Sequence, residues 1–145
     1  MTVAGPTFDL VIAANRLPVD RVVDPDGTST WRRSPGGLVT AMESVMKGRE
    51  AAWVGWAGEP GPAPEPFVED GVYLRPVGLS PSELEEYYEG FSNDTLWPIF
   101  HDVIVPATFH RPWWNTYRTV NQRFAQAIAE VAAPGATVWV HDYQL

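Results

Sequence analysis

Two polar residues at the end of an apolar run are the first candidates for chemistry in this sequence. Asn15-Arg16 follows Leu10 to Ala14, a run that is β-branched at its centre. The run is too short for a helix and predicts a strand buried on both faces. The ligand crevice of an open parallel sheet lies outside the carboxyl ends of its strands, where the Arg16 guanidinium could bind a phosphate. The alternative is a surface arginine that only closes a strand, and these residues alone favour it.

A glycine pair provides a second candidate. Gly36-Gly37 precedes apolar residues at helical spacing, which predicts a helix that begins near Gly37. Glycines allow a ligand to approach the backbone closely, and a helix N-terminus favours an anion. The pattern is neither G-x-G-x-x-G nor a Walker loop. Alone it is more often a tight turn, but combined with Arg16 across one crossover it suggests a diphosphate or sugar site.

Asp142 is the third candidate, after Thr137 to Val140, a run that predicts another buried strand. Its carboxylate could accept hydrogen bonds from sugar hydroxyls or take part in proton transfer. A turn aspartate that caps the next element explains the residue equally well.

An aromatic segment, YYEGFSNDTLWPIFH, spans Tyr87 to His101. Aromatic faces and hydroxyl groups suit sugars, whose C–H faces pack on rings. The alternative is an aromatic core cluster, which we prefer for Phe91 and Phe100. Tyr88 and Trp97 are the better ligand candidates, although only the family resemblance described below singles them out.

Composition limits the classes of function. The 145 residues are 45% apolar and lack cysteine, which fits one globular domain and excludes disulfides and thiolate metal sites. Three scattered histidines suggest no metal site, and a net charge of −8 disfavours nucleic acid and anionic membranes as partners. The first six residues carry no basic segment and no apolar run is long enough to span a membrane, so we expect a soluble cytoplasmic protein.

The predicted elements alternate between strand and helix after an early hairpin. Turn residues Asp24 to Gly27 predict a β-hairpin inserted after the first strand. Ser80 and Glu83 form a capping-box pattern for a helix that should end near Gly90. The remaining expectations are strands at 51–58 and 72–77, a proline-rich loop at 59–66, and a short strand or extended loop at 102–106.

A long amphipathic helix is predicted before Pro134-Gly135. Its apolar stripe should face the sheet, while Arg118 and Arg123 should be solvated; the stripe comprises Tyr117, Val120, Phe124, Ile128 and Val131. Together these elements predict an α/β fold, a Rossmann-like three-layer sandwich with a mostly parallel sheet.

Six segments carry a family resemblance: ANRLPV, SPGGLVTAM, WVGW, YYEGFSNDTLWPIFH, VNQRFA and VWVHDYQL. On them the chain resembles the trehalose-6-phosphate synthases, retaining glycosyltransferases of family 20 with the GT-B fold. The segments cover almost the whole chain in the family's order. One departure is Ala14, where many members carry serine before Asn-Arg.

The resemblance implies transfer of glucose from a nucleotide-glucose such as UDP-glucose to glucose 6-phosphate, with retention, in trehalose biosynthesis. It also implies roles for six residues. Arg16 and Tyr88 would bind the acceptor phosphate, Asp142 the acceptor hydroxyls, Trp97 would line the acceptor pocket, and Gly36 and Gly37 would approach the donor. No enzyme nucleophile, metal or cofactor is implied, so catalysis would depend on positioning and on stabilising the departing diphosphate.

The family also has a second, donor-binding domain. Residues 1–145 should therefore form an incomplete N-terminal acceptor domain that is inactive alone. Two alternatives stay open: a related synthase with another phosphorylated acceptor such as glycerol 3-phosphate, and a non-catalytic sugar-phosphate-binding regulatory homologue. An ordinary nucleotide-binding Rossmann module lacks support without the glycine fingerprint. The donor nucleotide and the formation of a homo-oligomer stay undetermined.

Overall fold

The computed structural model describes residues 5–102 and 104–145. Residues 1–4 and Val103 lie outside them. The expectation drawn from residues 1–6 therefore falls mostly outside the described part, and that for 102–106 is tested only on its other four residues. These four lie in turns, bends and irregular backbone, which favours the loop. No helix within the described residues is long and apolar enough to cross a membrane.

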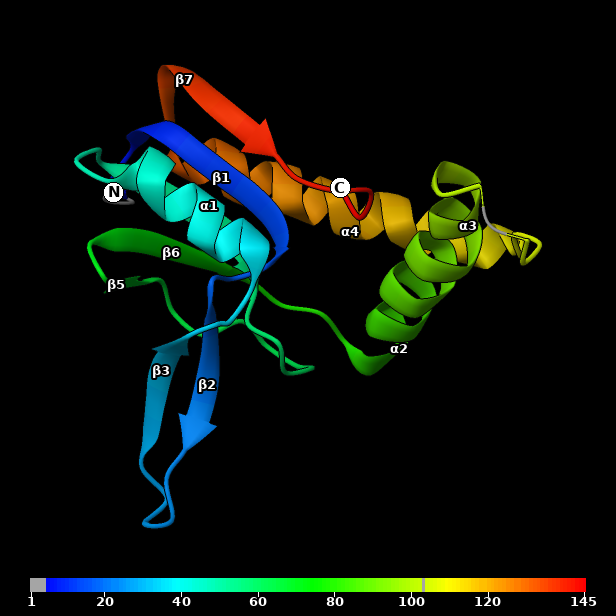
Figure 1. Cartoon of the computed structure of the whole chain (residues 1–145), viewed down its shortest axis with the longest axis horizontal. Coiled ribbons are helices and arrows are strands. Elements are labelled where there is room, and N and C mark those ends of the chain that lie inside the picture. The colour runs from blue at the N-terminus through cyan, green and yellow to red at the C-terminus, as the bar shows by residue number, and fades with distance from the viewer. Residues whose placement is uncertain (1–4, 103) are drawn as a thin grey trace.

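A five-stranded sheet forms the centre of the molecule, in the order β5-β6-β4-β1-β7 (Figure 1). Strands β1 (Phe8–Arg16), β4 (Ala51–Trp56), β6 (Val72–Val77) and β7 (Ala132–Val140) are parallel to one another. The edge strand β5 (Phe67–Glu69), which the sequence analysis missed, is antiparallel to β6. The mostly parallel sheet confirms the predicted fold class.

Alternate residues of the central strands face two separate cores, which produces three layers. Leu10, Ile12 and Trp53 face α1 (Gly37–Met46) through Met42 and Met46. The intervening strand residues face α4 (Arg111–Val131) on the other side of the sheet, in a cluster that includes Val11, Val54, Val120 and Phe124. Because β1 and β4 lie in the middle of the sheet, both faces of each strand are buried.

The predicted hairpin is confirmed as β2 (Val19–Val23) and β3 (Ser29–Arg33), which extend away from the sheet (Figure 1). Gly27 has a φ of 84° in its turn and donates its N–H to the carbonyl of Asp24. The hairpin begins three residues after Arg16, and it places Asp20 beside that side chain.

The predicted capping box is present, but the helix that follows continues past Gly90. Ser80 caps α2 (Pro81–Glu83), and helical backbone runs on through the π-helix η1 (Leu84–Leu96) into α3 (Trp97–Phe100). A Cβ atom on Gly90 would lie 2.6 Å from the Trp113 ring. Gly90 therefore permits close packing against α4 and does not end the helix.

Three predictions about exposure were wrong. Arg123 is not simply solvated: it donates two hydrogen bonds to the Glu83 carboxylate, at 2.8 and 2.6 Å, and so ties α4 to the capping box. This contact lowers the pKa of Glu83. Phe100 is 65% exposed instead of joining a core, whereas Phe91 does pack against Trp114 and Tyr117.

The third wrong prediction about exposure concerns strand β7, which was expected to be buried. Val138, Trp139 and Val140 are 39–48% exposed, because β7 is an edge strand that pairs only with β1 among the described strands. The strand also begins at Ala132, so α4 ends before Pro134-Gly135 and not at this pair.

Candidate functional site

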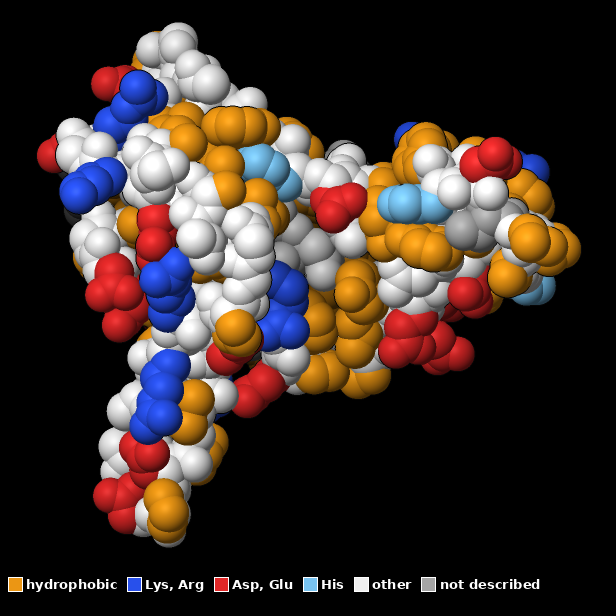
Figure 2. Space-filling model, in the orientation of Figure 1, with side chains coloured by type: hydrophobic (Ala, Val, Ile, Leu, Met, Phe, Trp, Pro, Cys, Tyr) orange, Lys and Arg blue, Asp and Glu red, His pale blue; other side chains and the backbone are white. Residues whose placement is uncertain are grey.

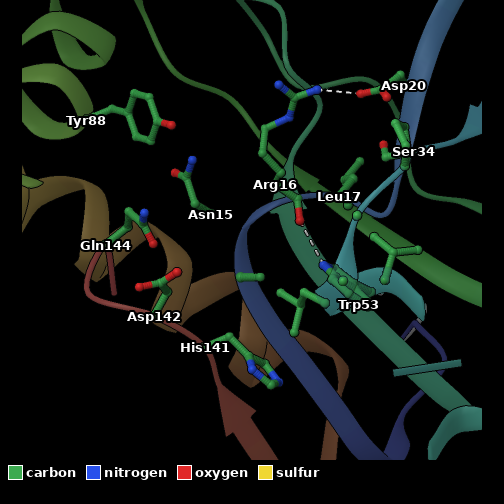
Figure 3. A pocket seen from close by; sticks show the side chains of 16 residues that line it. Asn15, Arg16, Leu17, Asp20, Ser34, Trp53, Tyr88, His141, Asp142 and Gln144 are labelled. Atoms are coloured by element: carbon green, nitrogen blue, oxygen red, sulfur yellow. Dashed lines mark hydrogen bonds and ion pairs between the residues drawn. The ribbon is translucent and has the colours of Figure 1, made fainter. Parts of the chain in front are cut away.

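A cavity of about 480 Å³ opens where β1 and β7 end (Figure 3). Five of the six residues predicted for the site line it, and they come from four separate segments of the chain. Arg16 ends β1, the glycine pair begins α1, Tyr88 belongs to η1 and Asp142 follows β7; the five are Arg16, Gly36, Gly37, Tyr88 and Asp142. The predicted convergence at one sheet edge is therefore present.

Arg16 is held from several sides. Its Nη2 atom donates to Asp20 Oδ1 at 2.6 Å, and the guanidinium lies 5.3 Å from the centre of the Trp56 ring. A Cβ atom on Gly58 would lie 2.5 Å from Arg16 Nη2, so only glycine leaves room for the guanidinium in this position. The backbone is fixed as well, because the Trp53 indole donates to the Arg16 carbonyl at 2.9 Å. Strand β4 and its exit turn thus position the cation.

The glycine corner leaves open space beside the first turn of α1. A Cβ atom at Gly36 or Gly37 would meet no atom within 4 Å. No described side chain caps this helix, and its first residues, including Leu38 and Val39, line the cavity. Uncapped N–H groups at a helix N-terminus attract an anion and donate hydrogen bonds to a ligand's oxygen atoms.

Asp142 and Tyr88 lie across the cavity from the hairpin (Figure 3). Asp142 has a φ of 70°, and its Oδ1 accepts a hydrogen bond from the N–H of Tyr143 at 2.9 Å. The ring of Tyr88 points from η1 toward Asn15 and Arg16 (Figure 3). The cavity therefore presents a cation on the hairpin side and, across from it, a phenol and a carboxylate. A phosphorylated polyol matches this arrangement, since its phosphate can bind the cation and its hydroxyls can bond to the carboxylate.

Trp97 is the predicted site residue that does not line the cavity. It is 39% exposed and stacks on His101 with 4.5 Å between ring centres. His101 in turn lies edge-on to Tyr143 at 6.2 Å. Trp97 is thus connected through His101 to Tyr143, the neighbour of Asp142, and its predicted contact with the acceptor stays a prediction.

Five polar residues line the cavity without an assigned role in the sequence analysis: Asn15, Asp20, Ser34, His141 and Gln144. Asn15 and His141 were visible as strand-end residues beside Arg16 and Asp142. Burial lowers the pKa of His141, whose buried Nε2 has no hydrogen-bond partner among the described residues. No sequence signal marks Ser34 or Gln144, because tertiary packing alone brings them here.

The family model of glycosyltransferase family 20 matches residues 9–145. The chain belongs to this family. Within the described residues no group of three histidine, aspartate or glutamate side chains could hold a metal.

The similar proteins are named as synthases of trehalose 6-phosphate. The chain is 56% identical, over 144 residues, to the trehalose-6-phosphate synthase of Mycolicibacterium smegmatis, covering 99% of this chain and 28% of that protein. A crystal structure of an alpha,alpha-trehalose-phosphate synthase (UDP-forming) from Burkholderia vietnamiensis aligns with a TM-score of 0.75 at 33% identity, over 95% of this chain and 29% of that one. The crystal structure of a Burkholderia xenovorans synthase in complex with glucose-6-phosphate aligns with a TM-score of 0.72 at 28% identity. This alignment covers 94% of this chain and 29% of that one. This member of family 20 thus spans under a third of its relatives' length.

Proposed function

We propose that the full-length protein transfers glucose from a nucleotide-glucose to glucose 6-phosphate, with retention, and forms alpha,alpha-trehalose 6-phosphate. This proposal rests mainly on one observation: the residues predicted for the site line one cavity at the carboxyl ends of the strands, namely Arg16, Tyr88, Asp142 and the Gly36-Gly37 corner. Family membership and similarity to synthases that are named UDP-forming, or bound to glucose-6-phosphate, support the same assignment.

Each residue has a proposed task. Arg16 and Tyr88 bind the acceptor phosphate, and Asp142 accepts hydrogen bonds from the acceptor hydroxyls. The glycine corner lets the donor sugar and diphosphate approach the N-terminus of α1. Trp97 completes the acceptor pocket from its flank. These groups hold the two substrates in a reactive orientation. Holding them in this orientation lowers the activation barrier for glucose transfer without a covalent enzyme intermediate.

The described residues supply only part of such a site. We propose that they belong to an acceptor-binding amino-terminal domain and that a separate domain binds most of the donor. The length of the relatives supports this division. Residues 1–145 alone should then bind acceptor weakly and produce no disaccharide. A cytoplasmic location stays a prediction, and the formation of a homo-oligomer stays undetermined.

Product formation by the full-length protein tests the proposal. The protein is incubated with glucose 6-phosphate and, separately, UDP-, GDP- and ADP-glucose, and products are identified by mass spectrometry and by NMR of the anomeric protons. We expect trehalose 6-phosphate with at least one donor. A parallel reaction with glycerol 3-phosphate distinguishes the related-acceptor synthase. Absence of product with every donor, despite binding of glucose 6-phosphate, would instead identify a regulatory sugar-phosphate-binding protein.

A further inference from the structure

Asn15 is a buried polar residue at the wall of the cavity. It is only 7% exposed, and its amide lies between Tyr88 and Arg16 (Figure 3). Consecutive strand residues normally point to opposite faces of a sheet, so Asn15 and Arg16 should not reach the same space. The pairing of β1 with β4 shifts register between Ala13 and Arg16, and both side chains line the cavity. Such irregularities redirect side chains.

The oxygen atom of the Asn15 amide already accepts a hydrogen bond from within the protein. The Tyr87 hydroxyl donates to Asn15 Oδ1 at 2.7 Å, and Tyr87 is fully buried. Burial raises the pKa of Tyr87 far above its ordinary value, so its hydroxyl keeps the proton that it donates. With Oδ1 engaged by this donor, Asn15 Nδ2 is left with two N–H groups. Neither has a hydrogen-bond partner among the described residues.

Asn15 Nδ2 is not among the described polar atoms that are buried without a partner, so its donors face the cavity, where water or a ligand can accept from them. The cavity already contains the Arg16 guanidinium, and a phosphate accepts several hydrogen bonds at once. We propose that Asn15 Nδ2 donates a hydrogen bond to the phosphate of the acceptor, and that Tyr87 is the positioning residue that fixes this orientation. This inference rests on the proposed function, because it assumes a phosphorylated acceptor.

Asn15→Asp is the sharpest test, because it keeps the shape and the bond from Tyr87 but replaces the donors with an anionic oxygen. Asn93→Asp is the matched control: Asn93 Oδ1 also accepts from a tyrosine, Tyr143, at 3.0 Å, but Asn93 does not line the cavity. Dissociation constants for glucose 6-phosphate and UDP-glucose are measured calorimetrically on the full-length protein. Thermal unfolding is measured in parallel.

We expect Asn15→Asp to weaken glucose 6-phosphate binding about ten-fold or more, and UDP-glucose binding by less than about two-fold. Asn93→Asp should change neither. Tyr87→Phe should weaken acceptor binding by about three-fold, because the amide is then free to rotate, and it decides the matter if Asn15→Asp does not fold.

The outcomes separate this inference from the proposed function. If Arg16→Ala weakens glucose 6-phosphate binding but Asn15→Asp and Tyr87→Phe do not, the role of Asn15 is overturned and the function stands. Equal losses for both ligands would also overturn it, since they indicate general damage to the site. If the unaltered protein neither binds glucose 6-phosphate nor produces trehalose 6-phosphate, the function itself is wrong.

Discussion

Arg16 enters the cavity already paired with a carboxylate. Asp20 holds Nη2 at 2.6 Å, but both side chains are 40–46% exposed, so the pair is weak and screened by water. A phosphate carries more charge than this one carboxylate and can accept two guanidinium hydrogen bonds. The ion pair therefore holds the side chain ready without competing strongly with the ligand.

Arg16→Ala should raise the KM for glucose 6-phosphate about ten-fold or more, because one charged hydrogen bond contributes about 1.5–3 kcal/mol. The KM for the nucleotide-glucose should change little. Arg21→Ala is the control, since Arg21 is an exposed arginine paired with Glu59 at 3.2 Å outside the cavity. Steady-state kinetics of both variants decide the matter, and an unchanged acceptor KM removes Arg16 from the phosphate site.

His141 makes the stability of the protein depend on pH. Burial lowers its folded-state pKa below the ordinary 6.5, and its Nε2 has no described acceptor for a second proton. The unfolded chain therefore binds the proton more tightly, and stability is lost as pH falls from about 6.5 through the lowered folded pKa. NMR titration of the imidazole should give a pKa below 6.5. In the His141→Gln variant, the free energy of unfolding, measured with urea, should fall less steeply as the pH decreases. A pH dependence equal to that of the unaltered protein would contradict this role of His141.

At the scale of elements, β4 and its exit turn determine where Arg16 lies. Two glycines approach Arg16 closely. A Cβ atom on Gly55 would lie 2.6 Å from the Arg16 carbonyl carbon, and a Cβ atom on Gly58 would lie 2.5 Å from its guanidinium. Trp53 and Trp56 provide a hydrogen bond and an aromatic face. The WVGWAG stretch, which the sequence marks only as a buried strand, is thus a support for the cation.

Gly58→Ala should raise the acceptor KM by about three- to ten-fold by displacing the guanidinium. Gly71→Ala is the matched control: both glycines have positive φ, 95° and 79°, but a Cβ atom on Gly71 would meet no atom within 4 Å. Both variants should lose similar thermal stability, since alanine is strained in either position. In the Arg16→Ala background Gly58→Ala should have no further effect on KM. Equal KM values for the two glycine variants would refute the role of Gly58.

The sequence predicted the arrangement of this site better than its details. Arg16 and Asp142 could be placed at one edge because parallel strands end on the same side of a sheet. Asn15 could not be assigned, because strand alternation directs it away from Arg16 and only the register shift returns it. Gly90 was misjudged because a glycine that ends a helix and one that admits a neighbouring ring look alike in sequence. Contacts such as that of Gly58 arise only in three dimensions.

At the scale of the whole molecule, the two edges of the sheet differ. The β5 edge is three residues long, whereas β7 is nine residues long and leaves Val138, Trp139 and Val140 partly exposed. Apolar side chains accordingly gather along the upper surface of the molecule, where β7 lies (Figure 2). A long apolar edge strand with unpaired backbone groups is a template for association with a second strand.

The isolated polypeptide 1–145 should therefore self-associate through β7 as its concentration rises across the micromolar range. Val140→Lys places a charge on this edge and should shift the polypeptide toward monomer, whereas Val68→Lys on β5 should not, although Val68 is 62% exposed. Sedimentation velocity of the three polypeptides distinguishes them. A monomeric unaltered polypeptide, or equal effects of the two lysines, would show that β7 is not the associating edge. In the proposed full-length protein, Val140→Lys should instead lower thermal stability if another segment covers β7.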